Sequence, residues 1–450
     1  MNIQKLKYKL YKGERRTQTI KKNILGSFAV KGVSILVSLA LIPLTLGYVS
    51  SEIYGIWLII SSILHWLVYM DVGFTLGLKN RLAEALAKQD YEKGRSLVST
   101  TYYIMTIIFV PTAIVSLVVS PYIDWCSIFN VNQIYQEDVL KTVQLLFIFL
   151  SIQMIVNVFV AVVAAFQKVA LSSLFNVIGQ ACALVIIFLM TKFVPPSLSN
   201  LAFAYSLMPV LVVAAASLIF FNGRFKKVAP SIHAIDTRYI KDLWNLGAKF
   251  FIIQVQIIVL YQATNILISH TEGPVAVTQY NIAYKIFNVL VMCYTIILNP
   301  LWPAFTDAYT KKDFTWMRRI YHKMTRIFYC LCLITIVVTL LSPILYKIWI
   351  GDKVEIPFTL TTAIAIYTLI YCWDSLQVLL INGIGTVKLQ TYVVMIGLIL
   401  HIPLSLLLGK FLGAVGVVTS MSTINIIYCI FFTTQIRKLL SRKASGIWIQ

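Results

Sequence analysis

Charged side chains inside apolar stretches are the residues of this chain best suited to chemistry. Two are lysines, Lys31 and Lys285, and two are aspartates, Asp71 and Asp374. Even low estimates put the cost of a charge at mid-membrane at about 2.5–3.5 kcal/mol, so such residues commonly mark substrate or ion pathways. The lysines would suit an anionic substrate, and the aspartates would suit a proton or sodium ion that drives transport.

Lys285 belongs to a polar stripe, because Asn281, Tyr284 and Asn288 recur beside it at helical spacing. Such a stripe is unfavourable against lipid, so it either joins two helices or lines a cavity. The lysine favours the cavity, where its ammonium would meet an anion. Lys31 has a second interpretation, in which its long stem carries the ammonium toward the membrane surface.

Asp374 and Asp71 are the candidate ion-coupling residues. Asp374 is the deeper of the two, whereas Asp71 lies near the end of its apolar stretch, where a charge costs little. Asp374 also has a structural interpretation, as a carboxyl group hydrogen-bonded to a neighbouring helix.

A bundle of membrane-spanning helices must position these residues. The chain has 450 residues and is 59% hydrophobic. It contains about twelve apolar stretches of roughly the 20 residues that a helix needs to cross the hydrocarbon layer. We therefore predict an all-α polytopic membrane protein. The predicted spans are 24–46, 53–74, 98–120, 142–163, 169–190, 198–221, 250–270, 277–298, 327–348, 358–381, 389–408 and 414–432.

The charge of the chain predicts its orientation. The net charge of +21 arises from 38 Lys and Arg against 17 Asp and Glu. Nearly all loop Lys and Arg lie in alternate loops, so both termini are predicted to be cytoplasmic. Orientation and attraction to anionic lipid explain the charge without nucleic acid. The predicted parts are a basic cytoplasmic segment 1–23, halves 24–221 and 250–433, a cytoplasmic linker 222–249, and a cytoplasmic tail 434–450.

One motif occurs twice, at positions about 223 residues apart. The sequence EALAKQDY at 84–91 is echoed by DAYTKKDF at 307–314, at the same place in each half. Because each half has an even number of spans, both halves enter the membrane in the same direction. We therefore predict two pseudo-symmetric six-helix halves around a central cavity that work by alternating access. At the same offset Gln254 corresponds to Lys31, so Gln254 is a further candidate cavity residue.

No catalytic constellation accompanies these features. The sequence has no Gly-rich phosphate loop followed by Lys and Ser or Thr, and no clustered metal-ligand motif, so no cofactor is predicted. Its seven cysteines have neither disulfide-framework nor zinc-site spacing. This argues against an ATP-driven pump and against a soluble type of enzyme.

Several short motifs carry a family resemblance. They are GYVSSEIYGIW at 47–57 followed by DVGF at 71–74, QYNIAYK at 279–285, and LWPAF at 301–305. The pattern resembles that of the bacterial polysaccharide flippases. These are exporters of lipid-linked O-antigen and capsule oligosaccharides in the multidrug/oligosaccharidyl-lipid/polysaccharide superfamily.

The resemblance implies a transporter that flips an undecaprenyl-pyrophosphate-linked oligosaccharide, an O-antigen or capsule/exopolysaccharide repeat unit, across the bacterial inner membrane. It also implies a cationic cavity lined partly by the first and eighth helices, which carry Lys31 and Lys285. Expected partners are this substrate, a proton or sodium ion, anionic membrane lipids and other polysaccharide assembly proteins.

Two alternatives to the flippase stay open from the sequence. A multidrug and toxin exporter of the same fold would place carboxylates in its cavity, because its substrates are cations. A membrane-embedded glycan polymerase or ligase is the other alternative, although such proteins usually have a larger external loop.

Overall fold

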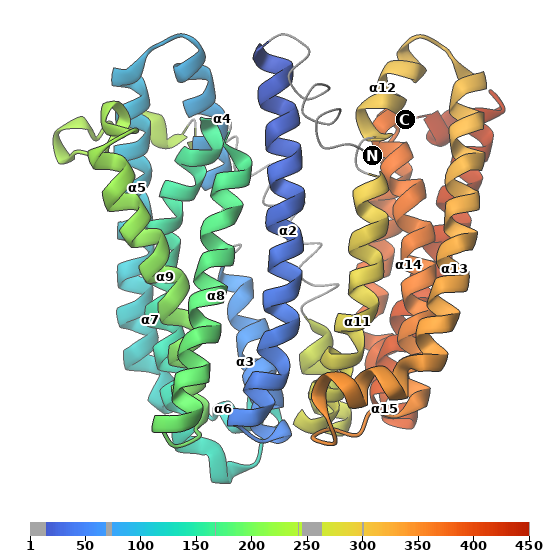
Figure 1. The fold of residues 1–450 in the computed structure, drawn as a ribbon. Coiled ribbons are helices and arrows are strands. Elements are labelled where there is room, and N and C mark those ends of the chain that lie inside the picture. Colours follow the sequence, from blue (N-terminus) through green and yellow to red (C-terminus); the bar gives the residue numbers. More distant parts are fainter. Residues whose placement is uncertain are drawn as a thin grey trace, which may run out of the picture. The chain divides into compact units, whose positions relative to one another are not determined.

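The computed structural model describes residues 15–68, 74–166, 168–241, 243–244, 263–298 and 301–449. Within these residues every regular element is a helix, and nine helices are long and apolar enough to cross a membrane. The predicted all-α polytopic membrane fold is therefore confirmed. The chain forms two compact units, Met1–Ile258 (unit 1) and Val259–Gln450 (unit 2) (Figure 1).

Unit 1 is a helical bundle organised around α7, which contacts α3, α4, α5, α8 and α9. Helix α2 packs mainly along α8. The long helices are α2 (Arg15–Tyr48), α3 (Ser51–Val68), α4 (Phe74–Ala87), α5 (Tyr91–Val119), α7 (Gln136–Ala165), α8 (Val169–Phe193) and α9 (Leu198–Asn222). Short helical turns connect them, namely η2 (Ser120–Tyr122), α6 (Trp125–Phe129), η3 (Gln133–Tyr135), η4 (Lys226–Val228) and η5 (Ile232–Ala234).

Unit 2 has α14 at its centre, in contact with α11, α12, α13 and α15. A helix over 263–272 precedes α11. The other helices are α11 (Pro274–Leu298), α12 (Leu301–Thr310), α13 (Phe314–Ile350), α14 (Phe358–Ile384), α15 (Lys388–Leu440) and the short η6 (Gly446–Ile449) (Figure 1).

Helix α15 is two membrane spans joined by a sharp bend at Gly413. This residue has φ 57° and ψ −138°, a conformation that glycine adopts without steric cost. The second arm begins at Ala414, whose backbone N–H donates to the Glu272 carboxylate at 2.6 Å. The two arms correspond to the predicted spans 389–408 and 414–432. The continuous helix α15 therefore contains both of these spans.

Two other predicted spans are only partly described. The stretch 53–74 is covered by α3 and the start of α4, with 69–73 outside the described residues, and only 263–270 of the stretch 250–270 is described. The nine continuous helices are therefore consistent with about twelve spans in two halves.

The repeated motif has the same backbone geometry in both units. Gln89 has φ 59° and Lys312 has φ 57°. The next residues, Asp90 and Asp313, each donate their N–H to a carbonyl five residues earlier at 2.9 Å. Each of these aspartates also caps the helix that follows, accepting from a backbone N–H at 3.0 Å. One turn thus starts α5 and α13 alike, as duplication predicts.

A second feature is shared by the two units. After α9, the Lys227 ammonium lies 4.5 Å from the centre of the Tyr91 ring, and after α15 the Arg442 guanidinium lies 4.5 Å from the centre of the Phe314 ring. Tyr91 and Phe314 are the equivalent last residues of the repeated motif. In unit 1, therefore, the segment after α9 folds back over the start of α5. In unit 2 the segment after α15 folds back over the start of α13 in the same way.

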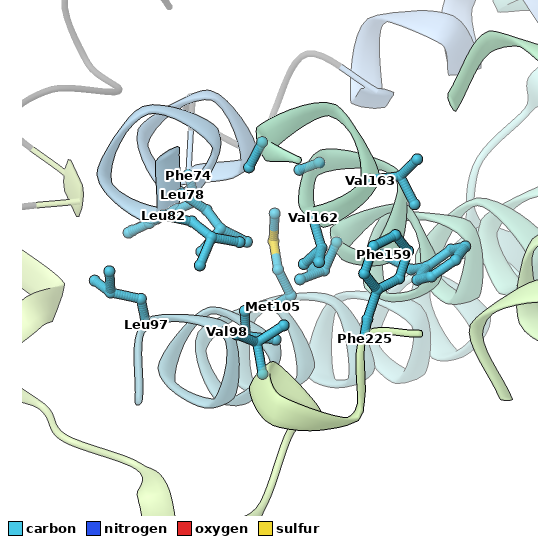
Figure 2. Packing of buried hydrophobic residues seen from close by; sticks show 14 of the residues in the cluster. Phe74, Leu78, Leu82, Leu97, Val98, Met105, Phe159, Val162, Val163 and Phe225 are labelled. Carbon is cyan, nitrogen blue, oxygen red and sulfur yellow. The ribbon is translucent and has the colours of Figure 1, made fainter. Parts of the chain in front are cut away.

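A buried cluster in unit 1 joins α4, α5 and α7 to the segment after α9 (Figure 2). Phe225, which is 1% exposed, inserts its ring between Phe159 and Phe166, with ring centres 6.3 and 4.6 Å away. Gly94 permits the close approach, because a Cβ there would lie only 3.1 Å from Leu82 and 3.2 Å from Val228. Part of the predicted linker 222–249 is thereby packed onto unit 1.

Candidate functional site

The polar face of α11 combines a helix-joining residue with a cation. The Asn281 side-chain amide donates to Asn265 Oδ1 at 2.9 Å and to the Val277 carbonyl at 2.8 Å. Asn265 lies on helix 263–272, so Asn281 links two helices. These bonds fit the helix-joining interpretation of the stripe at Asn281, and a role of Asn281 in substrate binding stays a prediction.

Tyr284 lies beside two other tyrosines. Its ring stacks on Tyr280, one turn earlier on α11, with centres 5.6 Å apart and planes 21° from parallel. It also lies close enough to Tyr371 of α14 for the two hydroxyls to interact electrostatically. The stripe thus reaches the surface of α11 that meets the central helix of unit 2. The stacked tyrosine pair forms a rigid aromatic surface that carries two hydroxyl groups.

Lys285 is half-buried on α11, and Asn288 is half-buried one turn farther on. Among the described residues none supplies Lys285 with a carboxylate or a hydrogen-bond acceptor. A half-buried ammonium without an anion is costly, and an incoming anion would lower that cost. Lys285 is therefore suited to binding an anionic group.

Lys31 is half-buried on α2 of unit 1. Two residues near it on the same helix, Val33 and Leu36, are 49% and 68% exposed. The structure describes each lysine within its own unit, so a cavity shared by Lys31 and Lys285 stays a prediction. Gln254 and Asp71 both lie outside the described residues, and their roles also stay predictions.

Asp374 lies in the interior of unit 2, where it is 8% exposed. Its Oδ1 atom has no hydrogen-bond partner among the described residues. Tyr428 and Cys429 of α15 are near enough to interact with it electrostatically. The structural interpretation, in which Asp374 ties two helices together, therefore lacks the hydrogen bond it requires at Oδ1.

Gln377 forms a second polar group one turn along α14 from Asp374. It is fully buried and accepts a hydrogen bond from the Tyr321 hydroxyl at 3.4 Å, while its Nε2 atom has no partner among the described residues. Sequence reasoning missed Gln377, Tyr321 and Tyr428. The signal for Gln377 was its i, i+3 spacing from Asp374 on one helix face.

The chemistry open to Asp374 follows from this burial. An ionised carboxylate with an unpartnered oxygen in an apolar interior is strongly disfavoured. Binding of a proton or a monovalent cation removes that penalty, so the position can exchange a positive charge as access to water changes.

His401 lies in the packing of α15, and its buried Nε2 atom has no hydrogen-bond partner among the described residues. It is 1% exposed, and its Nδ1 lies 3.4 Å from the Ser405 hydroxyl. Ser405 in turn lies 2.8 Å from Ser420 on the other arm of the helix. This chain of contacts joins the two arms.

Family models match most of the chain. The model described as polysaccharide biosynthesis protein matches residues 13–309, and the MatE model matches residues 251–407. A Yersinia pseudotuberculosis protein named for O-antigen export is 24% identical over 370 residues, covering 79% of this chain and 81% of the relative. A Salmonella typhi protein named for O-antigen transport is 20% identical over 370 residues, covering 80% and 82%.

Solved transporter structures share the fold. An inward-facing multidrug resistance MATE family transporter of the MOP superfamily matches with a TM-score of 0.78 at 14% identity, covering 94% of this chain and 100% of that one. A MOP superfamily transporter from Pyrococcus furiosus, whose binding pocket is described as having reverse polarity, matches with a TM-score of 0.64 at 14% identity, covering 97% and 98%.

Proposed function

The chain belongs to the polysaccharide biosynthesis protein family, and we propose that it is the flippase of a lipid-linked oligosaccharide. The relatives named for O-antigen export and transport support this proposal over most of their length. The proposed substrate is an undecaprenyl-pyrophosphate-linked repeat unit of O-antigen, capsule or exopolysaccharide. The proposed location is the bacterial inner membrane, with both termini cytoplasmic because the basic loops alternate.

The observation that carries the proposal is the half-buried Lys285 ammonium, which has no anionic partner among the described residues. A pyrophosphate cannot cross hydrocarbon unaided, since a desolvated anion must be paired. A lysine in a cavity replaces part of the lost hydration with a charge-assisted hydrogen bond. Its compact ammonium acts as a point charge and does not require one fixed orientation of the phosphate.

The proposed cycle alternates access between the two sides of the membrane. Lys31 and Gln254 would complete the cavity from the first and seventh spans, with Tyr284 and Asn288 beside Lys285. Asn281 would position α11 through its bond to Asn265. Other polysaccharide assembly proteins would supply the substrate and take it up.

Ion coupling through Asp374 would drive the cycle in one direction. A membrane potential supplies about 2.3 kcal/mol per elementary charge per 100 mV. Asp374 supports this role by its burial and its unpartnered Oδ1. Asp71 is the second proposed coupling residue, and the ion is a proton or sodium.

The second candidate function is multidrug export, favoured by the MatE match over residues 251–407. A transporter of cationic drugs requires an anionic cavity, whereas the half-buried ionisable residue on the polar face of α11 is a lysine. A polymerase or ligase is disfavoured by the relatives named for export and transport.

Substitution of Lys285 tests the proposal. In cells that depend on this protein for surface glycan, Lys285→Ala should abolish export while leaving the protein in the membrane, and Lys285→Arg should restore part of it. Lys410→Ala is the matched control, because Lys410 is an exposed lysine on α15 of the same unit. Normal glycan export by Lys285→Ala would remove Lys285 from the substrate site. Gradient-driven efflux of cationic dyes without glycan export would favour the drug exporter.

A further inference from the structure

Two adjoining cavities follow the seam between α14 and the second arm of α15. Their volumes are about 550 and 500 Å³. Both are lined by Ile370 and Ile426, so the two cavities adjoin there, and together they are called the seam groove. One end of the groove is lined by Arg437, and the other by Phe358 and Val415.

The residues of α15 that line the seam groove span about the thickness of the membrane. From Val415 to Arg437 the second arm of α15 rises about 33 Å at 1.5 Å per residue, against about 30 Å for the hydrocarbon core. A phospholipid acyl chain occupies only one leaflet, which is about half of that thickness. A single occupant that fills both cavities therefore needs a longer chain.

The lining of the seam groove is apolar although it contains many threonines. The hydroxyls of Thr419, Thr423 and Thr434 donate to their own helix, four residues back, at 2.8, 2.9 and 2.7 Å. Thr362 on α14 does the same at 2.9 Å. Because these donors are bonded to the backbone, the threonines offer methyl groups to an occupant. They are also smaller than leucine or isoleucine, which keeps the groove open.

Arg437 gives the seam groove a cationic end. Its side chain is exposed, and no carboxylate among the described residues pairs with it. Two neighbouring cations are already engaged with rings, since Lys438 lies 3.8 Å from the Trp448 ring centre and Arg442 lies 4.5 Å from that of Phe314. A free guanidinium suits a phosphate, which it can bind with two parallel hydrogen bonds.

The counterpart seam in unit 1 lies between α7 and α9, and aromatic rings fill it. Phe149 and Phe203 have ring centres 5.7 Å apart, and Phe159 and Phe220 have centres 6.0 Å apart. A smaller cavity of about 350 Å³ near this seam is lined by the polar residues Lys141 and Asn200. The duplicated fold therefore does not require an open apolar seam.

We propose that the seam groove binds the polyisoprenyl chain of the lipid-linked glycan before transport, with the phosphate end next to Arg437 until it moves to Lys285. This inference rests on the proposed function. The groove's length selects a chain longer than an acyl tail, its threonine and isoleucine lining accepts hydrocarbon, and its single cationic end matches an anionic headgroup. Holding the tail on unit 2 would keep the substrate on the protein while its glycan crosses.

Photo-crosslinking tests the inference on the full chain in lipid nanodiscs. The probe is undecaprenyl phosphate with a diazirine in its chain, and cross-linked peptides are mapped. Thr423→Phe fills the groove and should reduce labelling of α14 and α15 about tenfold. Arg437→Gln removes one charge-assisted contact and should weaken probe binding about tenfold. Thr106→Phe is the matched control, because Thr106 is an exposed threonine of α5 that bonds its own helix at 2.8 Å outside any described cavity.

Competition identifies the occupant. Unlabelled undecaprenyl phosphate should displace the probe, whereas farnesyl phosphate and phosphatidylglycerol should not. Equal displacement by phosphatidylglycerol would make the groove an ordinary lipid site and overturn the inference. Unchanged labelling in Arg437→Gln would overturn it as well, and this exposed substitution decides the matter even where Thr423→Phe fails to accumulate.

Glycan export by the unmodified protein separates the two proposals. Export without labelling of the seam groove would refute binding of the polyisoprenyl chain there, but it would not contradict the proposed flippase function. Labelling of the seam by a protein that moves no lipid-linked glycan would support the groove and refute the flippase function.

Discussion

Replacing Asp374 with Asn is the most discriminating perturbation of the proposed transport cycle. The two side chains have nearly the same size, but the amide cannot bind a proton at physiological pH or neutralise a cation. Asp374 is 8% exposed, and its Oδ1 has no partner among the described residues. The substitution therefore removes a titratable charge without removing a hydrogen bond at that oxygen.

Two magnitudes separate a coupling role from a structural one. If Asp374 carries one charge per cycle, a potential of 100 mV supplies about 2.3 kcal/mol, or roughly fifty-fold accumulation, and Asp374→Asn should reduce that to none. If Asp374 instead held helices together, its loss would cost about 1–3 kcal/mol of folding free energy. That cost would lower the melting temperature by about 2–4 °C per kcal/mol for a unit of this size.

Proteoliposomes with an imposed proton or sodium gradient provide the assay, and thermal unfolding in detergent provides the stability measurement. Asp374→Asn should move glycan-lipid at a rate independent of the gradient and melt at an unchanged temperature. Asp313→Asn is the matched control, since Asp313 caps α13 through a backbone N–H at 3.0 Å and asparagine caps equally well. It should keep the full response to the gradient.

Two results would refute this reasoning. Gradient-dependent transport at the unmodified rate in Asp374→Asn would exclude Asp374 from coupling. Gradient-independent flipping by the unmodified protein would exclude coupling altogether.

Three further predictions concern orientation and stability. With the native thiols removed, an impermeant reagent should label a cysteine at Asn132 but not at Lys312 in intact cells, and labelling at position 312 would reverse the orientation. Glu272→Ala should cost about 1 kcal/mol, measured by unfolding, because the second arm of α15 loses its cap at Ala414; an unchanged melting temperature would contradict that. Phe225→Ala should cost about 3–5 kcal/mol because its ring is 1% exposed in the unit 1 cluster, and a loss below 1 kcal/mol would show that the cluster does not depend on it.

Much of the fold could be predicted from the sequence because spanning length and hydrophobicity are local properties. The duplication was also visible, since EALAKQDY and DAYTKKDF encode the same turn, with Gln89 and Lys312 at equivalent positive φ. The sequence predicted two separate spans around Gly413, and it did not show that they join in one bent helix. A single glycine does not indicate that Glu272 will cap the second arm.

The candidate site was predictable only in part. Its ionisable residues stood out because a charge in an apolar stretch is costly whatever surrounds it. Their partners did not stand out, because partners come from other helices. Thus Asn281 proved to be bonded to Asn265, and Gln377 and Tyr428 were missed beside Asp374.

The sequence by itself determined the membrane class and the internal repeat of this protein, and it predicts the orientation, because hydropathy, charge and short motifs are local features of the chain. Only the tertiary structure decided which helix faces meet. That pairing leaves Asp374 Oδ1 unpartnered among the described residues and opens a groove between Ile370 and Ile426 in unit 2. The physical reason is that packing joins residues far apart in sequence, so a vacancy or an unsatisfied atom appears only when neighbouring helices are in place.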